Sequence, residues 1–256
     1  MKTKFSQLIL CVITLTLLAF SNILVAAEPS DLEFQILSGR VDSLLGEEWR
    51  SPIKYLVIVT SLSFIPAAAI ASTSFTRIII VLSMLRSALG LQSSPPNAVI
   101  ALLALFLTFF SMSPVFSNIN QNAIVPYLNE SQSLEKSVKL GTETLKKFMV
   151  SNTDKNTYIS LLDTVKADIP NDISQVSYMH LVPAFMLSEI KIAFQMGFLI
   201  FVPFILIDLI VASILMGLGM IMVPPMTISM PLKILVFVLA DGWSLLSRSL
   251  LMSIYG

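Results

Sequence analysis

The sequence has little of what soluble proteins use for chemistry and for contact with water. Only 12% of its 256 residues are charged, the formal net charge is zero, and it contains one cysteine and one histidine. A chain without a basic surplus has nothing to neutralise phosphates, which excludes nucleic-acid binding. Disulfides, thiol catalysis and cysteine-ligated metals are excluded too, because Cys11 lies in a segment that we expect to be removed.

Catalytic groups are equally scarce. The only histidine, His180, lies in a polar stretch with no other metal-ligating residues clustered near it in the sequence. Serines such as Ser188, next to Glu189, lack a plausible general base. We therefore expect no enzyme activity, no cofactor and no metal site.

Hydrophobic residues, in contrast, make up 55% of the chain, and the mean hydropathy is +0.83. Such values are typical of integral membrane proteins. Helical apolar runs, interrupted by prolines and charges, predict an all-α, polytopic membrane protein of long, broken helices with an external helical excursion.

The first 27 residues have the pattern of a secretory signal peptide. Lys2 and Lys4 precede an apolar run over 8–20, and small residues end at Ala27. Cleavage there would place the mature N-terminus outside the membrane. The alternative is an uncleaved first helix.

Composition divides the rest of the chain into four parts. We expect an external acidic arm (28–53), a first apolar helical pair (54–116), an external polar helical segment (117–180), and a second apolar helical pair (181–256) that contains a methionine-rich loop at 216–225. Within the polar segment, two amphipathic helices are predicted, one by Leu134, Val138 and Leu145 and one by Tyr158, Leu161, Leu162 and Val165.

The predicted topology follows from the two apolar pairs. If each helix of a pair crosses the membrane once, both the polar segment and the C-terminus lie outside, on the same side as the mature N-terminus. The positive-inside rule agrees, because Arg77, Arg86 and Lys233 then lie in or near inward connections.

Charged side chains nevertheless occur within or beside the apolar runs. They are Arg77, Arg86, Glu189, Lys191, Asp208, Lys233, Asp241 and Arg248. A charge in the middle of a bilayer costs about 2.5 to 3.5 kcal/mol on insertion scales, so these groups cannot all face lipid. Each needs a partner from another segment or another chain, unless it lies at a helix end and reaches the interface, as Arg77, Lys233 or Arg248 would. Lys233 and Asp241 lie too far apart along one helix face to pair with each other.

The stretch MGLGMIMVPP, 216–225, breaks the second apolar pair. The two prolines disfavour helix in the residues before them, so we expect the helix to end near Met220 and an extended loop to follow as far as Pro225. Backbone of this kind is tolerated at membrane depth only beside protein or a cavity, where adaptable methionine side chains would form a deformable seal. The alternative is a plain turn at the membrane surface.

Small residues recur at four-residue spacing in the second apolar pair. They occur at Ala193 and Gly197, and at Ser213 and Gly217, and they predict close helix packing, within the chain or between copies.

Several long stretches of the chain match a known pattern. Two of them are PAFMLSEIKIAFQMGF (183–198) and PLKILVFVLADGW (231–243), and the others are TSLSFIPAAAIASTSFTRIIIVLSMLRSALGLQSSPPN (60–97), LTFFSMSPVF (107–116) and MGLGMIMVPP itself. These stretches resemble the flagellar biosynthetic protein FliP family, part of the type III export gate, and the first two are similar to its two signature segments.

The resemblance implies a non-enzymatic, pore-forming subunit of the flagellar protein export gate, in the bacterial inner membrane at the flagellar basal body. It implies that copies of this chain form a homo-oligomer, which assembles with two smaller apolar gate subunits. The resulting gate would join the export-switch and large export-gate membrane proteins and would pass unfolded protein substrates. The family's methionine gasket would correspond here to Met220, Ile221 and Met222, with isoleucine where methionine is frequent. It also implies that apolar helices pack on neighbouring subunits, often beyond the bilayer, with the charges listed above paired between subunits or within the membrane.

Two other functions stay open at this point. One is the equivalent subunit of a virulence-type injectisome, although the predicted signal peptide favours the flagellar branch. The other is a transporter of small solutes or ions that acts alone, with Asp208 and Glu189 as binding groups beside a broken helix. The absence of an inverted repeat in the sequence is an argument against that transporter.

Overall fold

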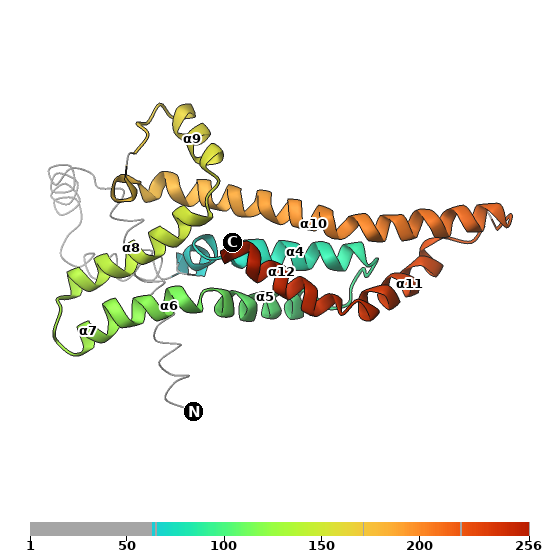
Figure 1. Ribbon diagram of the computed structural model, residues 1–256, viewed down its shortest axis with the longest axis horizontal. Helices are drawn as coiled ribbons and strands as arrows, with labels where there is room; N and C mark the ends of the chain where they lie inside the picture. The colour runs from blue at the N-terminus through green and yellow to red at the C-terminus, as the bar shows by residue number, and fades with distance from the viewer. Residues whose placement is uncertain (1–62, 65, 171, 221, 256) are drawn as a thin grey trace, which may run out of the picture. The chain divides into compact units, whose positions relative to one another are not determined.

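The structure is a computed structural model that describes residues 63–64, 66–170, 172–220 and 222–255 (Figure 1). The predicted signal peptide and external arm therefore lie outside the described residues. Every regular element of the described chain is a helix, which confirms the predicted all-α fold. The described residues form two compact units, one of residues 63–72 and 114–185 and the other of residues 73–113 and 186–255.

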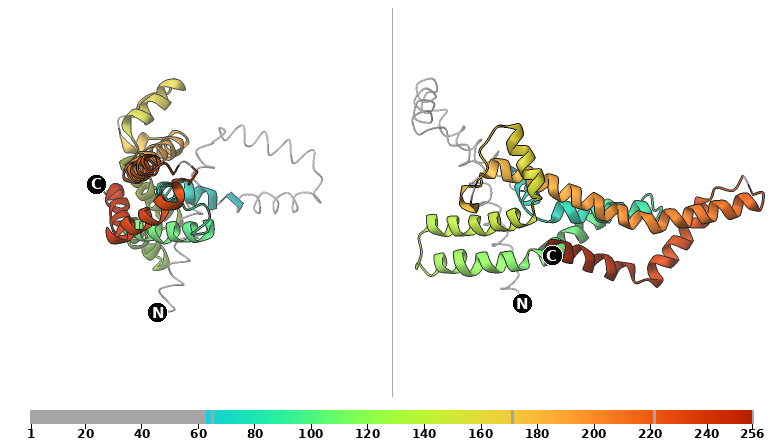
Figure 2. Two further views of the ribbon diagram at one scale, coloured as in Figure 1. Left: turned by 90° about the vertical axis from the view of Figure 1, so that its right-hand side faces the viewer. Right: turned by 45° about the horizontal axis from the view of Figure 1, so that its top comes forward.

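The first unit contains most of the polar segment. After α6 (Ser113–Ile119) come the π-helical turn η1 (Asn120–Ile124) and α7 (Val125–Leu128). α8 (Leu134–Asn152) then runs back along them (Figure 2), and α9 (Lys155–Thr164) and the short η2 (Ile173–Gln175) follow. The two predicted amphipathic helices are α8 and α9, which confirms both.

Local side chains explain where α8 and α9 begin. The Ser133 hydroxyl accepts a hydrogen bond from the backbone N–H of Lys136, and the Asp154 carboxylate accepts one from that of Asn156. Both are N-cap bonds, which satisfy a backbone donor that the first turn of a helix leaves without a partner.

The interior of this unit contains apolar side chains and one buried lysine. Ile119 and Ala123 pack against Leu140 of α8, and the rings of Phe148 and Phe185 meet edge to face at 6.0 Å. The Lys146 ammonium lies 5.4 Å from the centre of a tyrosine ring. Burial lowers the pKa of Lys146, although the negative charges of two nearby carboxylates, Glu143 and Asp172, oppose that shift.

The tyrosine is Tyr178, whose hydroxyl donates to the backbone oxygen of Thr142 at 2.7 Å. It is the first residue of α10 (Tyr178–Gly217), which leads out of this unit.

The second unit gathers the apolar helices. It consists of α4 (Phe75–Ala88), α5 (Asn97–Ser111), the part of α10 from Met186 onward, α11 (Met226–Leu239) and α12 (Gly242–Tyr255). α4 packs on α5, and its inner face is formed by Ile78, Val81 and Leu85.

Close packing occurs at one of the two predicted pairs of small residues. Ala193 is fully buried, and a Cβ at Gly197 would collide with the Met84 side chain of α4. This packing is within the chain. At the other pair, a Cβ added to Gly217 would meet no described atom within 4 Å, and Ser213 is exposed.

By length and composition, α10 is the one described helix that alone suffices to cross a membrane. α5 with the helices that follow it, and α11 with α12, qualify as two further spans only if each broken pair is counted as one. The apolar run from 98 to 116 is not one continuous helix, because α5 ends at Ser111 and α6 begins at Ser113. Pro114 accounts for the break, since it has no N–H to donate and its ring clashes with the preceding turn.

The break between α11 and α12 is sharper. The two helices meet at 67°, at Asp241, whose φ of 48° lies in the left-handed region. Asp241 also accepts the backbone N–H of Leu245 on its own carbonyl oxygen, so it begins the first turn of α12.

Candidate functional site

The methionine-rich loop connects α10 to α11. α10 ends at Gly217, and Gly219 follows in the left-handed conformation with φ of 75°. The Gly219 N–H donates to the oxygen of Met216, and the Met220 N–H donates to that of Leu215 at 2.9 Å. These two bonds form a Schellman motif, the common glycine-dependent end of a helix.

Two details of the predicted loop are therefore corrected. The helix ends at Gly217 rather than near Met220, because Gly219 readily takes the positive φ that the Schellman motif requires. The residues that follow are not simply extended, since the Val223 N–H turns back to the oxygen of Met220 at 3.4 Å. Pro224 and Pro225 accept backbone N–H groups of the first turn of α11 and fix the far end of the loop.

The loop presents its methionines outward. Met222 is 97% exposed and Met220 is 40% exposed, so the loop itself buries little of either side chain. Ile221, the middle position of the predicted gasket, lies outside the described residues. An almost fully exposed methionine gains hydrophobic stabilisation only when another surface covers it.

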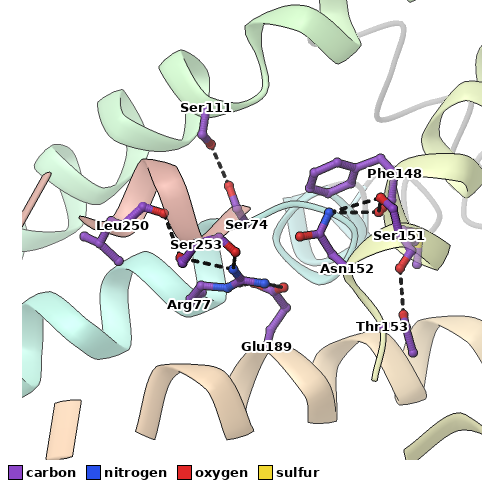
Figure 3. A network of polar contacts seen from close by, with 11 residues as sticks. Ser74, Arg77, Ser111, Phe148, Ser151, Asn152, Thr153, Glu189, Leu250 and Ser253 are labelled. Carbon is purple, nitrogen blue, oxygen red and sulfur yellow. Dashed lines mark hydrogen bonds and ion pairs between the residues drawn. The ribbon is translucent and has the colours of Figure 1, made fainter. Parts of the chain in front are cut away.

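The deepest charged group of the second unit is Arg77 of α4. Its side chain is fully buried, and its guanidinium makes two hydrogen bonds to the carboxylate of Glu189 on α10, one of them from Nε at 3.0 Å. A third bond, from Nη1, reaches the backbone oxygen of Ser253 near the end of α12. Figure 3 shows Arg77 between these two partners. The paired hydrogen bonds match the planar guanidinium to the carboxylate and connect three helices.

A second ion pair lies on the helices that flank the loop. Lys233 of α11 is buried and donates from Nζ to Oδ2 of Asp208 on α10 at 2.6 Å. It also donates to the backbone oxygen of Ala88 at the C-terminal end of α4 at 3.1 Å, where a cation is favourable to the helix dipole. The other oxygen of Asp208 is buried and has no hydrogen-bond partner among the described residues.

These two pairs answer the question of partners for four of the predicted charges. Glu189 and Lys233 pair with segments of the same chain that are distant in sequence, one of the two options that the sequence left open. The sequence also left open that Arg77 and Lys233 lie at helix ends and extend their charges to the membrane interface. The described structure does not show this, because both side chains are buried.

The four remaining predicted charges do not take part in these two ion pairs. Arg86 is half-buried and donates from Nη1 to the Pro95 oxygen and to Oδ1 of Asn97, so it fastens the connection between α4 and α5. The other three are exposed: Lys191, Asp241 and Arg248.

The structure adds polar contacts that sequence reasoning missed. Ser253 supplies both its backbone oxygen and its hydroxyl to Arg77, and the hydroxyls of Ser74 and Ser111 share a buried hydrogen bond of 2.7 Å between α4 and α5. Serines within apolar helices are a general signal for contacts between helices, but the spacing of these three gives no indication of their partners. No group of three or more potential metal ligands occurs among the described residues.

Comparison with known proteins identifies the family. The sequence model of the FliP family matches residues 58–250, which is more than half of the chain. This chain belongs to the FliP family. The methionine loop and both ion pairs lie within the residues that match the family.

Individual FliP relatives are similar over most of the chain. The flagellar biosynthetic protein FliP of Pectobacterium carotovorum subsp. carotovorum is 50% identical over 212 residues, which cover 82% of this chain and 81% of that one. The protein of the same name from Bacillus subtilis is 46% identical, over 81% of this chain and 94% of its own length. That from Aquifex aeolicus is 42% identical over 93% of this chain and 98% of the relative.

Proposed function

We propose that this FliP family member is a pore-forming, non-enzymatic subunit of the flagellar type III protein export gate in the bacterial inner membrane. Relatives that are up to 50% identical carry the name flagellar biosynthetic protein, which supports a role in flagellum assembly. The apolar α10 supports membrane insertion. The alternative of a transporter that acts alone is weaker, because one carboxylate that it would use, Glu189, is fully buried against Arg77.

The exposed methionine loop is the observation that carries the pore assignment. Gly219 and the two prolines fix where the loop begins and ends, while Met222 is left almost entirely uncovered. In a ring of copies, such loops would cover one another and form a flexible apolar constriction. Met220, Ile221 and Met222 are the residues that we assign to this gasket, which closes the pore until an unfolded protein substrate passes.

Assembly follows from the surface of α10. Its 40 residues extend for about 60 Å, roughly twice the 30 Å hydrocarbon core of a bilayer. Exposed apolar side chains occur along its whole length, from Met179 near its start through Phe198 to Met216 near its end. The part of this surface beyond the membrane needs cover from protein. We assign that cover to further copies of the chain and to the two smaller apolar gate subunits, with the export-switch and large export-gate proteins alongside the assembly.

The gasket is tested by replacing Met220 and Met222 together with alanine. Shortening both side chains should open the constriction, so cells or vesicles that contain the assembled gate should leak small ions and solutes faster than with the wild type. The measurement is the rate of solute efflux, normalised to the amount of assembled complex. Met226→Ala is the matched control, because Met226 is also an exposed methionine but lies at the start of α11 outside the gasket.

Unchanged leakage through confirmed assemblies of the double variant would refute the gasket. Leakage that rises equally in the Met226→Ala control would show that any loss of apolar surface near the loop disturbs the gate, and would also remove the specific role of Met220 and Met222.

A further inference from the structure

An apolar pocket lies within the second unit between α4, α5 and α12, separate from the ion pairs and the methionine loop. Its volume is about 400 Å³, within the range of sites that bind small molecules. Apolar side chains form most of its wall, among them Leu85 of α4, Leu103 of α5 and Trp243 of α12. A pocket of this composition favours a hydrocarbon chain over water.

One cation contributes to this pocket. Arg86 is the only charged residue that lines it, and the guanidinium donates from Nη1 to two uncharged acceptors, the Pro95 oxygen at 3.1 Å and Oδ1 of Asn97 at 2.7 Å. Among the described residues, no carboxylate forms an ion pair with Arg86. The pocket therefore combines an apolar volume with a charge that is not neutralised, and the complementary ligand is an amphiphile with an anionic head group.

The surroundings of Arg86 match the level of the membrane surface. Trp243, which also lines the pocket, is about half exposed, and the loop after α4 is rich in serine and proline. Tryptophan and arginine are typical of the interface between membrane and water. Leu82 and Leu103 line the pocket about one helical turn further from this loop, on the side of the apolar helices.

The outer face of α5 also supports access for lipid. Leu102, Phe106 and Phe110 are exposed on this helix, next to the face that lines the pocket. A lipid in the surrounding bilayer would reach the site laterally, with its acyl chain parallel to the helices and its head group at Arg86.

We propose that this pocket binds one acyl chain of an anionic glycerophospholipid, whose phosphate lies against the Arg86 guanidinium. A zwitterionic lipid fits less well, because its amine would need a carboxylate and none lines the pocket. The proposal requires that these helices lie in a bilayer and does not depend on the export function.

Lipid retention tests the site. The full chain is reconstituted in nanodiscs with equal amounts of phosphatidylglycerol and phosphatidylethanolamine of identical acyl chains, extracted in mild detergent, and examined for bound lipid by native mass spectrometry. We expect the wild type to retain phosphatidylglycerol about fivefold more than phosphatidylethanolamine, as one cation near an anionic surface provides roughly that factor.

Two variants change charge and volume separately. Arg86→Gln keeps an amide that can donate to Pro95 but removes the charge, so the preference for phosphatidylglycerol should fall to about one, the value for no electrostatic attraction. Val99→Trp, at a half-exposed position in the lining, should lower the retention of both lipids. Arg248→Gln is the matched control, because Arg248 is an exposed arginine of α12 that does not line the pocket.

Equal preference for phosphatidylglycerol in Arg86→Gln and wild type would overturn the proposal, as would a folded wild type that retains no lipid. A wild type without lipid whose Val99→Trp variant no longer associates with further copies would assign the pocket to a protein partner. Because one variant tests charge and the other volume, misfolding of either leaves the other as a test.

Discussion

At the residue scale, Arg77 is the charged group with the strongest requirement for a partner. It has no contact with water, and Glu189 is the carboxylate that balances its charge. Removing one member of a buried ion pair leaves the other charge without compensation, which is far more costly than removing both. This asymmetry distinguishes a buried pair from the exposed charges of the same helices.

We therefore predict that Arg77→Met destabilises the chain strongly, by about 3 to 5 kcal/mol, the range for breaking a buried pair. The matched control is Arg248→Met, which removes an exposed arginine from α12 and should change little. Melting of the purified chain in detergent measures both. The double variant Arg77→Met with Glu189→Met should regain much of the loss, because an apolar pair fits the same space without a buried charge.

A double variant that melts no higher than Arg77→Met alone would contradict this account. It would show that the bond from Arg77 to the Ser253 oxygen, rather than the ion pair, provides most of the stability.

At the element scale, the corner between α11 and α12 depends on the small size of Gly242. A Cβ at this position would overlap the ring of Phe237, which packs edge to face on Trp243 at 5.3 Å. Because both partners of the collision are fixed in the corner, the ring would have to leave its site. Overpacking of this kind costs about 1 to 3 kcal/mol.

Gly242→Ala should therefore lower the melting temperature in detergent. Gly217→Ala should not, because a Cβ at Gly217 meets no described atom and alanine is the better helix former. If both variants melt as the wild type does, the ring of Phe237 does not pack on residue 242. Trp243 fluorescence offers a second measurement, since displacement of the ring beside it should shift the emission of Gly242→Ala alone.

The helices and loops were easier to predict from the sequence than the ion pairs and hydrogen bonds that connect them. The two amphipathic helices of the polar segment follow from local spacing, and the loop at 216–225 follows from its glycines and prolines. The earlier end of α10 at Gly217 was also within reach, since a glycine just beyond an apolar run signals a helix C-terminus. The break at Met112 has a local cause as well, in Pro114.

The partners of the buried charges were out of reach. An apolar run that contains Arg77 indicates that a counter-charge exists somewhere, but Glu189 lies 112 residues away and no local pattern connects the two. The sequence gave even less indication that Ser253 is a partner of Arg77, because Ser253 accepts with its backbone oxygen, a group that every residue has.

At the scale of the whole molecule, the exposed apolar side chains of α10 extend over a greater length than the hydrocarbon core of a bilayer. α10 is about twice as long as a bilayer core is thick, and more than half-exposed apolar side chains occur at both ends, at Met179 and, just after the helix, at Leu218. Beyond the bilayer such surfaces are stable only when protein covers them, since exposed apolar patches of this extent mark interaction sites. We therefore expect a discrete assembly rather than a single chain.

The decisive measurement is the native mass of the complex that forms when the chain is coexpressed with its two proposed small partners and extracted in mild detergent. We expect one species that contains several copies of this chain together with those partners. The double variant Leu199→Lys with Leu206→Lys should reduce the yield of this species, because the two new charges would lie on the surface of α10 that neighbouring subunits cover and would have to be buried there. Val165→Lys, at an apolar residue of similar exposure beyond the end of α9, serves as the control and should leave the yield unchanged. A stable monomer under the same conditions would mean that detergent or lipid alone covers α10, and the export gate would lose its structural basis while membership of the family stayed intact.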